Sequence, residues 1–287
     1  MTKIALITDS SNDLPPSILA SHHIDVVPLM IHFGDEEFHD VYENRESFWK
    51  RLDQGELPRS AAPSVGAFYD AFAAALQDAD EVIAITITSK HSSTYGSALL
   101  AAAEFEDKVH VFDSWAISLG VGLLVLRAAR LIEQGAETSD ILADLEAARS
   151  RLRITLYLDS LDAIQRGGRI ALAMEAIKRM SSMFSIKIIL SMTEGELGFA
   201  GAVRSAKKGM RHIVESIAEH QAEAVAVAHT RTPERAGRLA DLAAATLDFP
   251  RGEILVAEAG PILGVHGGAG AFGVTFFERA SQNEPTI

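Results

Sequence analysis

The sequence contains no cysteine among its 287 residues, and its charge is unbalanced toward the negative side. Without cysteine the chain has no disulfide bonds, no thiolate metal ligands and no cysteine nucleophile. Against 39 Asp and Glu there are only 26 Lys and Arg, which gives a formal net charge of −13. Nucleic-acid binding needs positive charge that neutralises phosphates, so this balance argues against nucleic acid as a partner.

Several short motifs that would indicate a cofactor or a catalytic centre are also missing. There is no Walker A pattern, no His-Glu-x-x-His pair and no Gly-x-Ser-x-Gly elbow. The glycine-rich segment 264–270 is not a Rossmann fingerprint, because we expect a strand after it and not a helix. The apolar run 114–126 is too short to span a bilayer. With an N-terminus that enters a strand directly, we expect a cytoplasmic protein without cofactor or metal.

The first half of the chain alternates β-branched runs with helical segments. Hydrophobic residues make up 48% of the sequence, enough for a sizeable core. We expect strands at 3–8, 24–33, 82–88 and 108–112, and helices at 14–22, 45–52, 65–76, 97–103, 115–134 and 139–152. This alternation predicts an α/β domain with a parallel sheet over residues 1–150.

The second half mixes a hairpin with helices. Strands are expected at 154–158, 186–192, 197–203, 224–229, 253–257 and 271–278, with a hairpin turn at 193–196. Helices are expected at 206–220 and 233–247. The pattern predicts an α+β domain with a mixed sheet over residues 151–287, which carries a Gly-Gly-Arg loop at 167–169 and a His-Gly-Gly loop at 266–268.

Polar segments follow three of the expected N-terminal strands, at 9–11, 89–94 and 113–114. Parallel sheets bind ligands outside the carboxyl ends of their strands, although strand ends are commonly polar in any case. In the middle segment, Ser92, Ser93 and Thr94 precede a helix, whose first N–H groups lack partners. Such a hydroxyl loop is suited to an oxyanion, or one hydroxyl simply caps the helix.

Four further residues are candidates for a site or a contact. Ser60 lies in a segment bracketed by prolines, which predicts an extended or turned backbone. His266 lies among glycines that allow close approach to a ligand, unless its ring is satisfied within a turn. Arg169 belongs to a basic loop that contacts a phosphate or a partner, or is a solvated turn; Arg204 follows a strand and is placed to pair with a carboxylate between domains.

Together these segments resemble the DegV family of bacterial fatty-acid-binding proteins over the whole chain. The resemblance rests on their order, with matching segments at 7–11, 59–64, 91–95, 112–114, 167–170, 194–204 and 266–270. It implies a two-domain α/β carrier, without catalytic machinery of its own. The carrier buries a long-chain fatty acid such as palmitate or oleate in an apolar tunnel and presents it to a separate fatty acid kinase. A transient encounter with a membrane surface is compatible with this role.

The resemblance also implies which residues hold the carboxylate. Ser60, Ser92 and His266 match the family's head-group positions, with Thr94 in the same loop, while Arg169 and Arg204 are weaker candidates for a partner or phosphate contact. The family's Thr-Ser-Gln segment is Ser-Ala-Ala here, which loses two polar side chains. Its Ser-Gly-Thr loop is Ser-Ser-Thr, and we expect the Cβ of Ser93 to narrow the approach of the backbone to the carboxylate.

Two other functions stay open at this stage. One is a hydrolase of a small acid or phosphoester, with Ser92 as nucleophile and His266 as base. The other is a binding or regulatory subunit for a phosphorylated metabolite. A long apolar cavity would distinguish the fatty-acid carrier from both, because each buried methylene contributes about 0.8 kcal/mol to binding.

Overall fold

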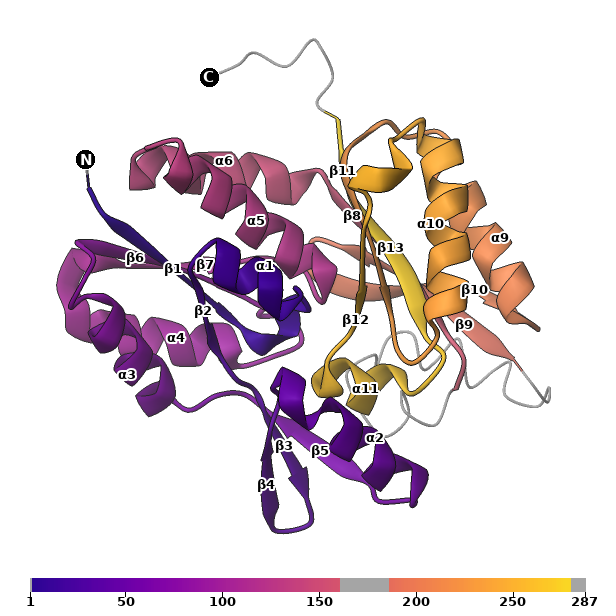
Figure 1. The fold of residues 1–287 in the computed structure, drawn as a ribbon, viewed down its shortest axis with the longest axis horizontal. Coiled ribbons are helices and arrows are strands. Elements are labelled where there is room, and N and C mark those ends of the chain that lie inside the picture. Colours follow the sequence, from indigo (N-terminus) through magenta and orange to yellow (C-terminus); the bar gives the residue numbers. More distant parts are fainter. Residues whose placement is uncertain (1, 161–185, 280–287) are drawn as a thin grey trace.

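The computed structural model describes residues 2–160 and 186–279 and contains three sheets (Figure 1). The first is a parallel sheet in the order β2–β1–β6–β7. Its strands are β1 (Ile4–Asp9), β2 (Ile24–Val27), β6 (Glu81–Thr86) and β7 (Val109–Asp113). Every residue of β6 after Glu81 is buried, as expected for a central strand with helices on both faces. This confirms the predicted parallel α/β half.

The second sheet is mixed, in the order β10–β9–β8–β13–β11–β12. Only β11 and β12 run parallel; the other neighbours are antiparallel. Its strands are β8 (Leu152–Leu158), β9 (Lys187–Thr193), β10 (Glu196–Val203), β11 (Ala222–His229), β12 (Leu255–Glu258) and β13 (Phe272–Glu278). The hairpin β9–β10 turns at Glu194 and Gly195, so the predicted α+β half with a mixed sheet is also confirmed.

Helix α5 (Leu119–Glu133) lies between these two sheets and packs on both, with α6 (Thr138–Ser150) beside it (Figure 1). Two glycines allow this close packing. A Cβ at Gly120 would lie 2.7 Å from Ile154 of the mixed sheet, and one at Gly122 would lie 2.7 Å from the carbonyl oxygen of Asn12, just after β1. The predicted boundary at residues 150 and 151 falls between α6 and β8 and stays a prediction.

The outer faces of the two sheets are covered by helix pairs. Helices α3 (Val65–Ala75) and α4 (Thr94–Ala102) cover the parallel sheet, and α9 (Ala206–Ile217) and α10 (Pro233–Leu247) cover the mixed sheet. A short helix, α1 (Pro16–Ser21), precedes β2. The structure also contains 3₁₀ turns at Ser10–Asn12, Tyr42–Asn44, Ala103–Lys108 and Arg251–Glu253. Within the described residues, no helix is both long and apolar enough to cross a membrane.

A third, antiparallel sheet was not predicted. The single strand expected at 24–33 is wrong: the chain leaves β2 at Val27 and forms β3 two residues later, because Pro28 cannot donate to a strand ladder. The sheet has the order β4–β3–β5, and helix α2 packs on it. Its elements are β3 (Met30–Phe33), β4 (Glu36–His39), β5 (Pro58–Ala61) and α2 (Arg45–Asp53).

The expected His-Gly-Gly loop is wrong in one respect. Residues Pro261–Gly267 form a short helix, α11, and His266 lies in its last turn. Proline at the first helical position and Gly268, with φ +67°, after the last one mark its two ends. Helix α11 packs against β3, β5 and α2, so a C-terminal segment completes the core of the third sheet. The Gly-Gly-Arg loop at 167–169 lies outside the described residues.

Candidate functional site

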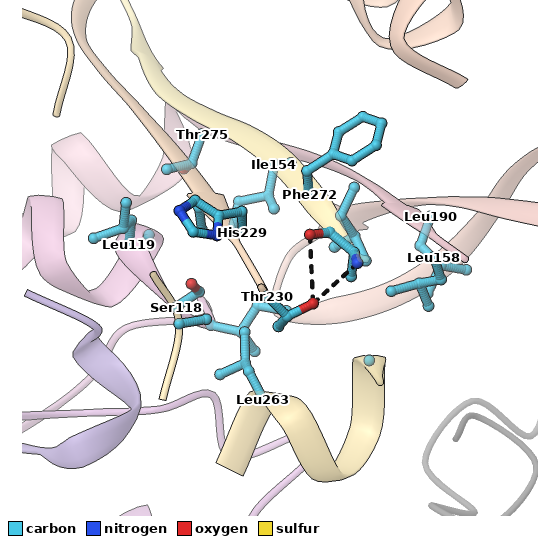
Figure 2. A pocket seen from close by; sticks show the side chains of 18 of the residues that line it. Ser118, Leu119, Ile154, Leu158, Leu190, His229, Thr230, Leu263, Phe272 and Thr275 are labelled. Atoms are coloured by element: carbon cyan, nitrogen blue, oxygen red, sulfur yellow. Dashed lines mark hydrogen bonds between the residues drawn. The ribbon is translucent and has the colours of Figure 1, made fainter. Parts of the chain in front are cut away.

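An apolar cavity lies between the start of α5, one face of the mixed sheet and helix α11 (Figure 2). The cavity has a volume of about 120 Å³. Leu119 lies on the α5 side of the cavity, Leu158 and Leu190 project from the mixed sheet, and Leu263 reaches it from α11. The polar side chains of the lining are Ser118, His229, Thr230, His266 and Thr275.

Three of these polar side chains are already engaged by the protein. Thr230 Oγ1 donates to the carbonyl oxygen of Gly268 at 2.6 Å. It also accepts from the N–H of Ala271 at 2.9 Å (Figure 2). Ser118 Oγ donates to Asp13, and His229 Nδ1 accepts from the N–H of Thr232. Burial lowers the pKa of His229, which favours its neutral ring. The cavity therefore presents mostly hydrocarbon to a ligand.

His266 contributes a polar group to the cavity wall from α11, and there it contacts Ser60, another residue predicted for the site. Its Nε2 lies 2.8 Å from the hydroxyl oxygen of Ser60, which is on β5 and half-buried. The two residues are 206 positions apart in the chain. When Nε2 carries a proton and donates to Ser60, the Ser60 hydroxyl hydrogen is free to point at an oxyanion. Two of the residues predicted for a carboxylate site are thus in contact.

Ser92 and Thr94 form a second hydroxyl pair at the start of α4. Their hydroxyl oxygens lie 2.8 Å apart, and Ser92 Oγ also accepts from the N–H of Thr94 at 3.3 Å. Ser92 thus satisfies one N–H at the start of α4, whereas Ser93, the N-cap residue, makes no capping hydrogen bond with its side chain. Ser93 is exposed, with φ −81°, a conformation open to any L-residue, so its side chain costs no backbone strain. Within the described residues no hydrogen bond joins this pair to Ser60 and His266.

The loop before α4 is nevertheless attached to the cavity wall through the β9–β10 hairpin. His91 Nε2 accepts from the backbone N–H of Leu197 at 2.9 Å, and Leu197 lines the cavity. Thr88 Oγ1 donates to the carbonyl oxygen of Gly195 at 3.0 Å. Gly195 has φ +83°, and a Cβ there would lie 2.6 Å from Thr88 Oγ1, so this docking requires glycine.

The hydrolase alternative has no support from these contacts. His266 pairs with Ser60 and not with Ser92, whose hydroxyl is bonded to Thr94. His91, the sequence neighbour of Ser92, uses Nε2 to accept from a backbone N–H, so that nitrogen is not available as a base. In the part of the chain that the structure describes, no group of three or more acidic, His or Cys side chains is placed to hold a metal ion.

The two predicted arginines give less information. Arg204 is exposed between β10 and α9, next to Ser205, which caps α9 by accepting from the N–H of Lys208. It forms no ion pair within residues 2–160 and 186–279, so the expected pairing between domains is not seen. Arg169 lies outside the described residues.

Three buried carboxylates lie near the end of β1, and two of them, Asp13 and Asp40, hold the start of α11; only Asp9 belongs to a segment that was predicted from the sequence. Asp9, Asp13 and Asp40 are at most 3% exposed. Asp9 accepts from backbone N–H groups of Ser11 and Ile87, so part of the polar strand end predicted as ligand-binding is structural. Asp13 and Asp40 bond α11 itself. Their separation along the chain gave no sequence signal that would group them.

The fold and cavity define a class: an α/β protein with two large sheets, a shared middle helix and an apolar cavity. Residues 3–279 match the sequence model described as "Uncharacterised protein, DegV family". The chain therefore belongs to the DegV family, as the sequence motifs indicated.

Relatives agree over nearly full length. A DegV domain-containing protein of Caldanaerobacter subterraneus is 33% identical, with 97% of this chain and all of that protein covered. A solved structure from Thermus thermophilus, described as fatty acid binding of a DegV family protein, is 31% identical with a TM-score of 0.89, covering 96% of this chain and all of that one. DegV from Bacillus subtilis, described as a fatty acid binding protein, is 28% identical with a TM-score of 0.84, covering 97% of this chain and all of its own.

Proposed function

We propose that this protein binds one long-chain fatty acid, with the alkyl chain in the apolar cavity and the carboxylate at Ser60 and His266. The observation that carries this proposal is the imidazole of His266, which lines the cavity and is hydrogen-bonded to Ser60. An apolar wall with one polar end fits an amphiphile with one head group. Each methylene buried contributes about 0.8 kcal/mol, and each charge-assisted hydrogen bond to the carboxylate about 1.5–3 kcal/mol.

Ser92 and Thr94 are proposed to complete the head-group site. Their hydroxyl oxygens lie 2.8 Å apart, so one hydroxyl donates to the other. The hydroxyl that accepts keeps its own hydrogen, which it can donate to a second carboxylate oxygen. Their loop is fixed to the hairpin that lines the cavity. The Thermus and Bacillus relatives are described as fatty acid binding, which supports the same ligand class here. A phosphorylated metabolite fits less well, because it has no use for a hydrocarbon wall.

Native mass spectrometry of protein purified from a bacterial host tests the ligand. We expect a non-covalent adduct with the mass of a C14–C18 fatty acid, and uptake of palmitate or oleate after delipidation. Ser60→Ala/Ser92→Ala should lose the adduct, while Ser97→Ala, which removes one hydroxyl from the body of α4, should keep it. Protein that stays free of ligand with excess palmitate and oleate would refute the proposal, and a phosphate-containing adduct would favour the metabolite alternative.

We also propose that this cytoplasmic carrier presents its acid to a separate kinase, which phosphorylates the carboxyl group. Arg204, exposed after β10, and Arg169 are the proposed contacts. Arg204→Glu should slow acyl phosphorylation by the cognate kinase at unchanged fatty-acid affinity. Arg211→Glu, a charge reversal at an exposed position of α9, is the matched control. Equal rates for the two variants would remove Arg204 from the partner surface.

A further inference from the structure

Two buried carboxylates hold the start of helix α11. Asp13 Oδ1 accepts from the backbone N–H of Gly260 at 2.6 Å, and Asp40 Oδ1 accepts from that of Ile262 at 3.2 Å. Their other oxygens accept from hydroxyls: Ser118 donates to Asp13 at 2.6 Å, and Ser10 donates to Asp40 at 2.7 Å. A helix this short and rich in glycine has little intrinsic stability, so these contacts contribute to keeping it in place.

The two carboxylates converge on one point of the backbone. A Cβ at Gly260 would lie 3.0 Å from Asp40 Oδ1 and 3.4 Å from Asp13 Oδ1. Both acids are 3% exposed. Two negative charges that are so close together and so little exposed repel each other strongly, and a bound proton relieves that repulsion.

The charged and titratable groups around this pair are Asp9 on β1, Arg45 on α2, and Tyr42 and Glu43, which line a pocket together with both acids. Burial is the main cause that raises the pKa of Asp13 to about 6 and that of Asp40 to about 7. Asp13 raises the pKa of Asp40 further, while the hydrogen bonds and the charge of Arg45 act in the opposite direction. The pair therefore holds a proton near neutral pH.

Helix α11 uses its two sides for different purposes. Ile262 and Val265 pack into the aromatic core around Phe48 and Trp49. His266 and Gly267 line the cavity, and Leu263 contacts both the cavity and the aromatic core. Movement of α11 away from its seat would open the cavity wall and separate His266 from Ser60.

We propose that Asp13 and Asp40 are a proton-dependent anchor for α11 that controls how readily the cavity exchanges its ligand. While the pair shares one proton, α11 stays docked. When both acids are ionised, their repulsion loosens α11 and ligand exchange is faster. The ligand half of this inference rests on the proposed fatty-acid function, whereas the movement of α11 does not.

Hydrogen–deuterium exchange of ligand-free protein tests the movement. Protection of the amides of α11, corrected for the intrinsic pH dependence of exchange, should fall from pH 5 to about 7 and level off above. One released proton allows a change of up to about tenfold per pH unit. Asp40→Asn keeps an acceptor for Ile262 without the charge and should reduce the fall in protection, and Asp13→Asn should reduce it as well, because each variant leaves only one acid to ionise. Asp241→Asn, an exposed acid of α10, should leave it unchanged.

The release rate of a bound fluorescent fatty acid, such as parinaric acid, tests the consequence. The release rate should rise on the order of tenfold over the same pH range in the native protein and clearly less in Asp40→Asn, where only Asp13 is left to ionise. Constant α11 protection in the native protein, or the same pH profile in Asp40→Asn, would overturn the anchor. A protein that shows the change in α11 but binds no fatty acid would refute the proposed function and leave the anchor standing.

Discussion

Replacement of Asp40 by asparagine should stabilise the folded protein, and by more at high pH than at low pH. Asn has the size of Asp and keeps an oxygen for the N–H of Ile262, while Ser10 can turn its hydroxyl to accept from the new amide. What the variant removes is the ionisation of a carboxyl whose pKa is raised from 3.8 to about 7, mainly by burial. The variant thus isolates the free-energy cost of that buried charge.

The sign and size follow from linkage. Because the folded protein binds the Asp40 proton more tightly than the unfolded chain, ionisation lowers the free energy of unfolding as pH rises from about 4 to 7, with little further change above. A shift of about three pKa units, at about 1.4 kcal/mol each, sets a ceiling near 4 kcal/mol. Between pH 5 and pH 8 the advantage of Asp40→Asn should grow by about 2–3 kcal/mol.

Urea unfolding of delipidated protein at pH 5 and pH 8 measures this difference, provided that the dependence of free energy on urea is the same for both proteins. Asp241→Asn serves as the control, because its carboxyl is exposed and its effect should not vary over this range. A stability difference between native protein and Asp40→Asn that stays constant or shrinks toward pH 8 would refute the reasoning, because the charge at Asp40 would then be well compensated.

Three further predictions concern the fold and the site. Gly122→Ala should lower the free energy of unfolding by about 1–3 kcal/mol, because its Cβ meets a backbone carbonyl at 2.7 Å, whereas Gly237→Ala in α10, with open space around it, should raise it by up to about 1 kcal/mol in urea melts. His266→Gln should weaken the binding of palmitate at least about tenfold in a displacement titration and leave the binding of hexadecanol, which has no carboxylate, nearly unaffected. Equal losses of affinity for the two ligands would contradict a head-group role. Leu263→Glu should abolish uptake of palmitate seen by native mass spectrometry, and Leu242→Glu at an exposed position should not.

The sequence predicts both large sheets because their strands leave strong local signals. Runs such as 82–86 are buried and β-branched, and the helices between them have clear apolar faces. The third sheet leaves no such signal. Strand β4 is Glu-Glu-Phe-His, with one buried residue, and β5, on the other side of β3, contains proline and arginine. These strands form because Ile31, Phe33 and Phe38 pack with α2 and α11, and such contacts cannot be read from a short window.

Helix α11 illustrates the same limit at the site. Its seven residues, Pro-Ile-Leu-Gly-Val-His-Gly, have a poor helix propensity and read naturally as a loop. The helix is selected by partners far away in the chain: the carboxylates at 13 and 40 and the aromatic pair Phe48 and Trp49. The contact of His266 with Ser60 was therefore inferable only from the family motifs, and not from any periodicity.

Parallel sheets commonly bind ligands at the carboxyl ends of their strands, which predicted a ligand site at that edge of the N-terminal sheet. The structure shows that part of this edge has a structural role. At that edge, Asp9 accepts from the backbone N–H groups of Ser11 and Ile87, and Asp113 Oδ1 accepts from those of Ser89 and Trp115, so both acids connect loops. Asp13 reaches across to Gly260 of the C-terminal half. Once these acids are used to fasten loops and α11, the apolar face of the mixed sheet is where a ligand of low polarity can be accommodated.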